Sequence, residues 1–374
     1  MSLAMVTWIG EIALSWAVLF AIQVPLRRKP RPVARTVAYC VKLVLIPLVA
    51  LLFVAVDSVA TYTCGGLLGA VYIALIGDAL SSPIEYAARR IRSATRAGGE
   101  GSACMQGVVA VLSLLTCVAV AAYGVWNATT VNQRVHEWET EGLAREHTFA
   151  FLADMHAGSA QSLEVLQDLC AQINEAKPEF VILGGDVTDE LTSFEDMNRT
   201  YEIISEIDAP VYFVYGNHDR QPNSDCVGGR TYSDGQLETA LANAGVHVLS
   251  DEFVRVADDL VLLGREDISA GAARSLWTEL DNPYEGKGAL VVVDHQPYDS
   301  AQLADEKSAL QLSGHTHAGQ LWPLQAVYSA LGLPAYGEFR YLGTLLYVSA
   351  GESGWMAPLR TERHCEWDLI TLKP

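Results

Sequence analysis

Residues 147–156 read HTFAFLADMH and residues 180–189 read FVILGGDVTD, and these two stretches decide the fold. In each stretch a short apolar run stops at a carboxylate, and runs of this length and composition are typical of buried strands. The same pattern recurs along the C-terminal two thirds of the chain. It predicts strands at Thr148–Ala153, Phe180–Leu183, Val211–Tyr215, Leu260–Leu263, Ala289–Val293, Ala309–Leu312 and Leu345–Ser349.

Amphipathic stretches lie between several of these strands. They predict helices at Ser162–Ala176, Phe194–Ile207, Gly235–Ala244 and Ala272–Leu280. Strands that alternate with helices indicate an α/β domain with a largely parallel sheet core. Ligands of such sheets bind beyond the carboxyl ends of the strands, so functional residues are expected there.

Polar clusters stand at five of the predicted strand ends. They read DMH at 154–156, GDVTD at 185–189, GNHD at 216–219, H at 295 and GHTH at 314–317. These clusters hold five of the nine histidines in the chain. Each cluster alone is a weak signal, because turn residues and surface histidines produce it by chance. Their joint occurrence indicates one site.

The residue types in these clusters are metal ligands. Two neighbouring divalent ions need imidazole nitrogens and carboxylate oxygens, with one carboxylate bridging the ions. Side chains alternate along an extended chain, so Asp154 and His156 are expected on one side, as are His315 and His317. A donor set without thiolate suits two divalent metal ions of Mn, Fe or Zn, with Mn favoured.

The order of the clusters resembles the calcineurin-like metallophosphoesterase superfamily, whose pattern is D-x-H, G-D-x-x, G-N-H-[DE], a lone His and G-H-x-H. The resemblance covers about residues 148–374. It implies an α/β sandwich of two mixed β-sheets flanked by helices. GHTHAGQ at 314–320 with the following Pro323, and VSAG at 348–351, resemble the membrane-anchored branch, transmembrane proteins with a metallophosphoesterase domain.

The resemblance also implies roles for single residues. It assigns Asp154, His156 and His317 to a first metal, Asn217, His295 and His315 to a second metal, and Asp186 to a bridging position. His218 would protonate or stabilise the leaving oxygen while a hydroxide between the metals attacks phosphorus in line. Asp189 would orient His218 as its partner, although its position also permits a helix N-cap, and both readings stay open.

The N-terminal third of the chain is apolar. Its four apolar runs are about Val6–Val24, Val37–Val56, Cys64–Leu80 and Val108–Trp126. Each run approaches the ~20 residues that span a bilayer as a helix, and four such runs disfavour the alternative of buried soluble helices. We therefore expect a membrane domain with four transmembrane helices over 1–130, a linker over 131–147 and the metallophosphoesterase domain over 148–374.

Basic loops predict the orientation of these runs. Arg and Lys residues cluster at 27–35 and at 89–96, whereas 57–63 has none. The positive-inside rule places both basic loops in the cytoplasm. The C-terminal domain is then expected outside the cytoplasm, on a multi-pass integral protein of the plasma membrane.

Charge divides the chain in the same way. Residues 1–130 carry 10 Lys+Arg and 5 Asp+Glu and the remainder carries 15 and 39, so the net charges are +5 and −24. The acidic part disfavours nucleic acid as a partner.

The segment Trp322–Phe339 is apolar and aromatic, and is either a flap that lies on membrane lipid or ordinary packing under a loop. We expect a phosphoester substrate that is lipid-linked or part of the cell envelope.

The sequence thus predicts a membrane-tethered dinuclear-metal phosphoesterase, with phosphodiesters favoured over monoesters. One alternative is a membrane receptor or transport protein whose metal domain binds a ligand without turnover. Transport would need a polar path, for which the apolar runs offer only Glu11, Lys42 and Asp78. The other alternative is a cytoplasm-facing nucleotide phosphodiesterase. The substrate, the metal identity and the oligomeric state stay open.

Four smaller features have two readings each. Asn127-Ala128-Thr129 is a weak match to a glycosylation sequon. Arg220 is a phosphate clamp or a solvated loop charge. Asp294 supports a metal ligand or faces outward. Cys226 and Cys365 pair or, as we favour, stay free thiols.

Overall fold

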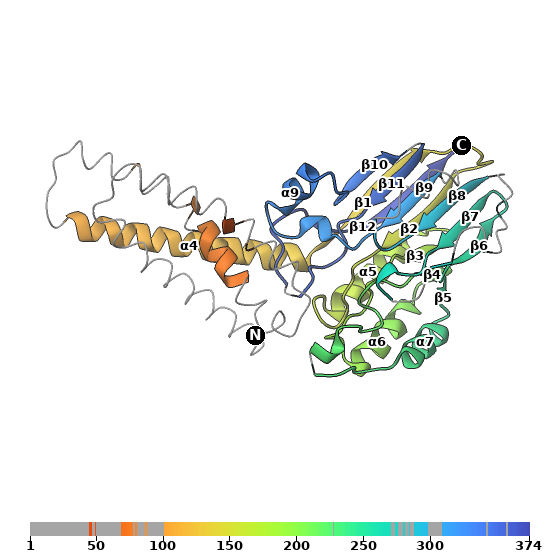
Figure 1. Cartoon of the computed structure of the whole chain (residues 1–374), viewed down its shortest axis with the longest axis horizontal. Coiled ribbons are helices and arrows are strands. Elements are labelled where there is room, and N and C mark those ends of the chain that lie inside the picture. The colour runs from red at the N-terminus through yellow and green to blue at the C-terminus, as the bar shows by residue number, and fades with distance from the viewer. Residues whose placement is uncertain are drawn as a thin grey trace. The chain divides into compact units, whose positions relative to one another are not determined.

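The chain forms two compact units, Met1–Trp126 with Leu321–Leu324, and Asn127–Gln320 with Gln325–Pro374. The computed structural model describes residues 101–374 except 227, 271–273, 276–279, 281–283, 285–287, 298–308, 342 and 357. Of the first hundred residues it describes 45, 46, 49, 69–77, 79, 80 and 87. Figure 1 shows the elements in chain order.

A long apolar helix, α4 (Gly101–Thr129), is the main described element of the first unit. Its segment Val111–Thr129 has a mean hydropathy of 1.7 and is the one described helix long and apolar enough to cross a membrane. This segment overlaps the fourth expected span, 108–126. The third expected span is described as helix over 69–77, and the first two lie outside the described residues except for 45, 46 and 49. The arrangement of four transmembrane helices stays a prediction.

One six-stranded sheet of the second unit has the strand order β1-β12-β2-β3-β4-β5. Its strands are β1 (Val131–Glu139), β12 (Cys365–Lys373), β2 (His147–Leu152), β3 (Val181–Leu183), β4 (Val211–Phe213) and β5 (His247–Val248). β2, β3, β4 and β5 are parallel, β1 is parallel to β12, and β12 runs antiparallel to β2. The carboxyl ends of β2, β3 and β4 therefore lie at one edge of this sheet.

The other six-stranded sheet has the strand order β10-β11-β9-β8-β7-β6. Its strands are β10 (Gly337–Tyr341), β11 (Thr344–Val348), β9 (Leu310–Ser313), β8 (Ala289–Val293), β7 (Leu260–Gly264) and β6 (Glu252–Ala257). The four inner strands are parallel, and the outer strands β10 and β6 are antiparallel to their neighbours. Both sheets are mixed, as the resemblance implied.

Three helices connect the parallel strands of the first sheet. They are α5 (Leu163–Ala176), α6 (Phe194–Ile204) and α7 (Asp234–Asn243), which follow β2, β3 and β4. Each begins after a serine whose hydroxyl oxygen accepts a backbone N–H of the first turn, namely Ser162, Ser193 and Ser233. Helical crossovers of this kind are what parallel neighbouring strands require.

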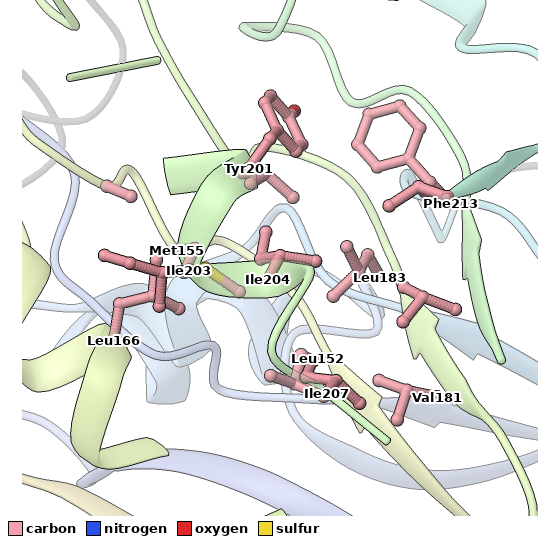
Figure 2. Close-up of a cluster of buried hydrophobic side chains, with 14 of the residues drawn as sticks. Leu152, Met155, Leu166, Val181, Leu183, Tyr201, Ile203, Ile204, Ile207 and Phe213 are labelled. Atoms are coloured by element: carbon pink, nitrogen blue, oxygen red, sulfur yellow. The ribbon is translucent and has the colours of Figure 1, made fainter. Parts of the chain in front are cut away.

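The strands of the first sheet bury side chains on both faces. Leu152 of β2 and Leu183 of β3 pack against Ile204 of α6 in the cluster that Figure 2 shows. Phe149 and Phe151 point to the opposite face of β2 from Leu152, and they pack between the two sheets. Because both faces are buried, these strands read as continuous apolar runs, and the sequence reveals them for that reason.

Residues 131–147, where we expected a linker, contain β1. Nine residues of β1 pair with β12, from Val131 opposite Cys365 to Glu139 opposite Lys373. The sequence VNQRVHEWE hides this strand because most of its side chains are exposed at the sheet edge. These residues therefore belong to the sheet of the second unit.

All seven expected strands are present, with ends within two residues of the expected ones. Three of the expected helices correspond to α5, α6 and α7, and the fourth, 272–280, lies mostly outside the described residues. The strands that the sequence did not predict are β1, β5, β6, β10 and β12. β5 has two residues, and β12 carries Glu366 and Asp368 within its apolar pattern.

Candidate metal centre

The loops after β2, β3, β4, β8 and β9 bring the expected site residues together. Potential ligand atoms form two groups, each within 4.8 Å, made of Asp154, His156 and His317, and of Asp186, His295 and His315. All are buried except His315, which is half-buried. Strand ends from both sheets therefore contribute to one cluster.

The backbone of these loops adopts unusual conformations. Asp154, His156 and Asp186 have φ of 56°, 44° and 54°, and His315 and His317 have φ of 70° and 48°. A left-handed conformation costs an L-residue about 1–2 kcal/mol, and such residues gather at functional sites. The D-x-H and H-x-H segments are thus not the extended segments that we expected. Each pair is brought together by left-handed residues instead.

Three glycines permit the close approach of these loops. A Cβ at Gly185 would lie 2.6 Å from the backbone nitrogen of Gly216 and 2.7 Å from His295 Nδ1, and Gly185 also has φ of 94°. A Cβ at Gly314 would lie 2.5 Å from Asp154 Oδ2, and one at Gly216 would collide with Asp186. Any side chain at these positions would displace a candidate ligand.

In the first group, two imidazoles are fixed so that Nε2 points toward the group. His156 Nδ1 lies 3.1 Å from Asp189 Oδ2, and His317 Nδ1 lies 3.0 Å from the Ser353 carbonyl oxygen. His317 Nε2 is 3.6 Å from Asp154 Oδ1. His156 Nε2 is buried and has no hydrogen-bond partner among the described residues. A buried nitrogen without a partner is costly unless a cation or another donor fills the place.

In the second group, His295 Nδ1 lies 2.8 Å from the Gly184 carbonyl oxygen, which leaves Nε2 to face the group. His295 Nε2 is 3.0 Å from Asp186 Oδ2 and 3.1 Å from Asn217 Oδ1. His315 Nδ1 is 2.7 Å from the same Asn217 oxygen. Converging oxygen and imidazole donors of this kind fit a divalent transition metal.

Asp186 lies between the two groups. Its Oδ2 is 3.0 Å from His295 Nε2 and 4.0 Å from His156 Nε2. Its Oδ1 accepts the backbone N–H of His218 at 2.8 Å, which fixes the carboxylate plane. One oxygen is thus within reach of ligand atoms from both groups, so these residues fit a pair of divalent ions.

The electrostatics of the metal-free chain favour the protonation states that metal ligands need at three of the six residues, His315, His317 and Asp186. At His295 burial lowers the pKa, but Asp186 and Asp154 raise it well above its usual value. Burial and the charge of His295 lower the pKa of His315 to about 3. Burial and neighbouring charges also hold the pKa of His317 well below its usual value. Burial raises the pKa of Asp186, but the neighbouring histidines, His295 first, hold it well below its usual range. His315 and His317 are therefore neutral and Asp186 is ionised at neutral pH, as coordination requires.

His218 stands beside the two groups and is held by a carboxylate that we did not predict. Its Nδ1 lies 2.9 Å from Glu190 Oε2, and its ring stacks on Trp355 at a centroid distance of 5.3 Å. Burial lowers the pKa of His218, but the charge of Asp186 and the Glu190 carboxylate raise it to about 10. In the metal-free chain these carboxylates therefore favour the protonated form of His218.

Asp189, which we expected to orient His218, contacts a different histidine. Its Oδ2 binds His156 Nδ1 at 3.1 Å and accepts from the Ser159 hydroxyl at 2.6 Å. Its Oδ1 accepts the backbone N–H groups of Leu191 and Thr192. The N-cap reading fails as well, because Ser193 caps α6. Two consecutive carboxylates thus hold two different imidazoles.

Asp219 fixes the loops that carry these residues. Its two oxygens accept four backbone N–H groups at 2.7–3.1 Å, those of Asp186, Val187, Thr188 and Gly216. The loop after β3 and the loop after β4 are therefore held against each other. GNHD alone does not predict this role, because the last residue of that motif also fits a turn.

Arg220 and Asp294, which had two readings each, are both paired with an oppositely charged residue. Arg220 forms a two-point ion pair with Glu266 at 2.7 and 3.0 Å, so its guanidinium is engaged by a carboxylate. Asp294 is buried and binds Arg274 at 2.6 and 2.9 Å. Cys365 is a free, buried thiol, so it does not pair with Cys226.

Known proteins resemble this chain over the same region. Residues 147–319 match the family model described as Calcineurin-like phosphoesterase. A "Transmembrane protein with metallophosphoesterase domain" from Danio rerio is 29% identical over 298 residues, 76% of this chain and 66% of the relative. An "Uncharacterized metallophosphoesterase" from Helicobacter pylori is 26% identical over 239 residues, 62% of this chain and 61% of the relative. The chain thus spans less than two thirds of each of these relatives.

A third relative is matched over more of its own length. "Phosphodiesterase YaeI" from Escherichia coli is 30% identical over 202 residues, 50% of this chain and 70% of the relative. The region matched by the family model contains every candidate ligand, from Asp154 to His317. On these similarities, and with two groups of candidate metal ligands at the expected strand ends, the chain belongs to the calcineurin-like metallophosphoesterase family.

Proposed function

We propose that the protein is a membrane-tethered phosphoesterase that uses two divalent metal ions, with Mn favoured over Fe or Zn. The observation that carries the proposal is the position of Asp186, whose Oδ2 lies within 4.0 Å of imidazole nitrogens from both ligand groups. Asp154, His156 and His317 would hold one ion, and Asn217, His295 and His315 the other. Such an ion pair activates a water molecule and withdraws charge from phosphate oxygens.

His218 would donate the proton to the leaving oxygen. Glu190 binds its Nδ1, so Nε2 is the nitrogen that faces a substrate, and no described residue hydrogen-bonds to Nε2. The raised pKa of His218 in the metal-free chain supports this role, because a general acid must be protonated. Asp189, through His156, would act on the metal site and not on the leaving group.

We favour a phosphodiester of a lipid or of the cell envelope as the substrate. The YaeI relative is named a phosphodiesterase and the Danio rerio relative a transmembrane protein. Residues 318–337, directly after the last ligand, contain no charged side chain although the C-terminal part of the chain carries −24. Within them Trp322, Leu331 and Leu333 are 48%, 67% and 41% exposed. Exposed apolar side chains in the segment that follows the last candidate ligand suit a substrate presented by a membrane.

The charges of the N-terminal loops favour a location for the catalytic domain. The basic loops at 27–35 and 89–96 favour a multi-pass protein of the plasma membrane with this domain outside the cytoplasm. A protease-accessibility assay on intact cells tests this. Cleavage of the domain only after lysis would place it in the cytoplasm and favour a nucleotide phosphodiesterase.

The test of activity uses the full chain in detergent, stripped of metal and reloaded with Mn²⁺. Bis-p-nitrophenyl phosphate is compared with p-nitrophenyl phosphate, with His218→Ala as the matched variant. We expect Mn²⁺-dependent cleavage of the diester that falls about 10²–10⁴-fold in the variant, whereas both proteins bind the same amount of metal. Two bound metals without turnover would favour the receptor reading. Preference for soluble nucleic acid over lipid-linked diesters would contradict the proposed substrate class.

A further inference from the structure

The last turn of α4 is part of the second unit and is tied to a loop near the metal centre. Asn127 is fully buried, and its Nδ2 donates to the carbonyl oxygens of Arg363 at 2.6 Å and Arg360 at 3.1 Å. Its Oδ1 lies 2.6 Å from His364 Nδ1. Because both amide hydrogens are engaged and the side chain is buried, Asn127 is not an accessible glycosylation acceptor despite its sequon.

The neighbouring residue adds further contacts. The carbonyl oxygen of Ala128 accepts from Gln161 Nε2 at 3.4 Å and lies 3.5 Å from Cys365 Sγ. Gln161 Nε2 also donates to the Glu352 carbonyl oxygen at 2.8 Å. The final turn of α4 is thus joined to the chain before α5 and to the segment 352–365.

Arg360 links the segment that Asn127 binds to the candidate ligand His317. It is fully buried, and none of the described carboxylates forms an ion pair with it. Its guanidinium donates to backbone carbonyl oxygens, at 2.8 Å to His317 and at 2.8 Å to Ser353, and also to Ala350 and Glu362. Its Nη1 also donates to Cys365 Sγ at 3.3 Å. A buried charge held by several carbonyl groups fixes the backbone that supplies them.

His317 is held from two directions by this arrangement. Its own carbonyl oxygen accepts from Arg360, and its Nδ1 lies 3.0 Å from the Ser353 carbonyl oxygen that Arg360 also binds. The position of the ring, and hence of Nε2 at 3.6 Å from Asp154 Oδ1, depends on Arg360. Outer partners of a metal ligand typically change metal affinity 10–100-fold when they are removed.

We propose that Asn127 is a positioning residue for the first metal. It holds the 360–364 loop, the loop holds Arg360, and Arg360 fixes the backbone and ring of His317. The inference rests on the proposed dinuclear site and adds that the last turn of α4, from Asn127 onward in the second unit, takes part in building it. Asn127 touches neither metal nor substrate, and acts only through Arg360.

The test measures metal binding and not turnover. The full chain in detergent is stripped of metal and titrated with Mn²⁺, and free Mn²⁺ is read by electron paramagnetic resonance. We expect two ions in the parent. In Asn127→Ala we expect one ion bound as in the parent and the other 10–100-fold more weakly, with loss of the spin-coupled signal of the pair.

Asn132→Ala is the matched control. Asn132 Nδ2 also donates to a backbone carbonyl oxygen of the same segment, that of Cys365 at 3.3 Å, but Asn132 is exposed and lies on β1. We expect parental binding of both ions in this variant. Equal weakening in Asn132→Ala and Asn127→Ala would show general destabilisation and overturn the proposal.

A second variant covers the case in which Asn127→Ala does not fold. His364 is exposed and binds Asn127 Oδ1, so His364→Ala keeps the buried amide. We expect the same ion to bind more weakly, by less than in Asn127→Ala. If Asn127→Ala folds and binds both ions with parental affinity, the inference is overturned and the proposed function is left intact. The same holds if Asn127→Ala is unfolded and His364→Ala binds both ions with parental affinity. A parent that binds no divalent ion refutes both.

Discussion

Replacing Glu190 by glutamine separates the roles of two consecutive carboxylates. Glu190 lies 2.9 Å from His218 Nδ1, and Asp189 lies 3.1 Å from His156 Nδ1. Glutamine keeps the length of the side chain and an oxygen that accepts from Nδ1–H, but it removes the negative charge. The expected result is a lower pKa for His218 with an unchanged metal content.

The size of the expected change in the pKa of His218 follows from the burial of Glu190 and His218. Glu190 and His218 are 1% and 6% exposed, so solvent screens their interaction weakly. A hydrogen bond to a charged partner stabilises by about 1.5–3 kcal/mol and a neutral one by about 0.5–1.5 kcal/mol. The difference of about 1–1.5 kcal/mol corresponds to about one pKa unit.

The direction of the change in rate follows from the proposed role of the His218 ring as a general acid. Burial lowers the pKa of His218, whereas Asp186 and Glu190 raise it, to about 10 in total. A general acid is active below its pKa, so the variant loses the imidazolium at a lower pH. The alkaline limb of kcat/KM should move down by about one unit, and the rate above both limbs should fall about tenfold.

The assay is the pH profile of diester cleavage by the Mn²⁺-loaded full chain, with metal content measured on the same samples. A phenyl leaving group should show a larger loss than a nitrophenyl one, because the poorer leaving group depends more on protonation. Asp189→Asn is the matched control. It should weaken metal binding 10–100-fold and move the limb by less than Glu190→Gln does, because Asp189 raises the pKa of His218 less than Glu190. An unmoved limb in Glu190→Gln, or a shift in Asp189→Asn as large as that in Glu190→Gln with intact metal, would refute the assignment of Glu190 to His218.

Three further changes test other parts of the site. Asp186→Ala should lower the metal content by both ions, and full occupancy by elemental analysis would contradict its bridging position. Gly216→Ala should impair metal binding because its Cβ would collide with Asp186, whereas Gly235→Ala, with nothing within 4 Å of its Cβ, should bind metal normally. Glu352 is fully buried, and both its carboxylate oxygens lack a partner among the described residues. Burial raises its pKa well above the ordinary 4.5, so the folded state retains a proton that the unfolded state releases, and stability falls as pH rises above that value. Glu352→Gln should therefore raise the melting temperature of the metal-free chain at pH above neutrality and have little effect in acid. A difference that does not grow with pH would contradict this.

The positions of the candidate metal ligands could be predicted from the sequence because the chemistry is local to strand ends. Strands buried on both faces read as apolar runs, and in each cluster the ligand follows its strand directly. The order of the clusters then identified the resemblance to the calcineurin-like metallophosphoesterase superfamily. Asp154, Asp186 and His295 were accessible to this reasoning because neither packing nor long-range contact was needed to recognise them.

The partners of these ligands could not be predicted in the same way. Whether Asp189 or Glu190 reaches His218 depends on the direction of each side chain after a tight loop, and both residues are carboxylates. Arg360 binds the carbonyl oxygen of His317 across 43 positions of sequence, and nothing in its local pattern marks it. Long-range backbone contacts of this kind leave no periodicity.

The strand β1 was missed for a different reason. An edge strand with one side in solvent needs few apolar residues, and its pairing energy comes from backbone hydrogen bonds that every sequence can form. β12 shows the complementary case, because Glu366 and Asp368 are buried in it. Their oxygens accept from the Tyr347 hydroxyl at 3.2 and 2.7 Å, a pairing that joins the two sheets and is invisible along the chain.

The pairing of β1 with β12 also bears on how this domain behaves among other copies of itself. Over nine residues β1 occupies the hydrogen-bonding edge of β12, a strand whose first four residues are buried. An uncovered edge of this length is a template for any other extended chain, and natural proteins shield such edges. β1 itself presents polar side chains and an arginine outward. A catalytic fragment that begins after β1 would therefore expose the unpaired edge of β12. Aggregation of such a fragment would result from the missing strand and not from a change in the metal centre.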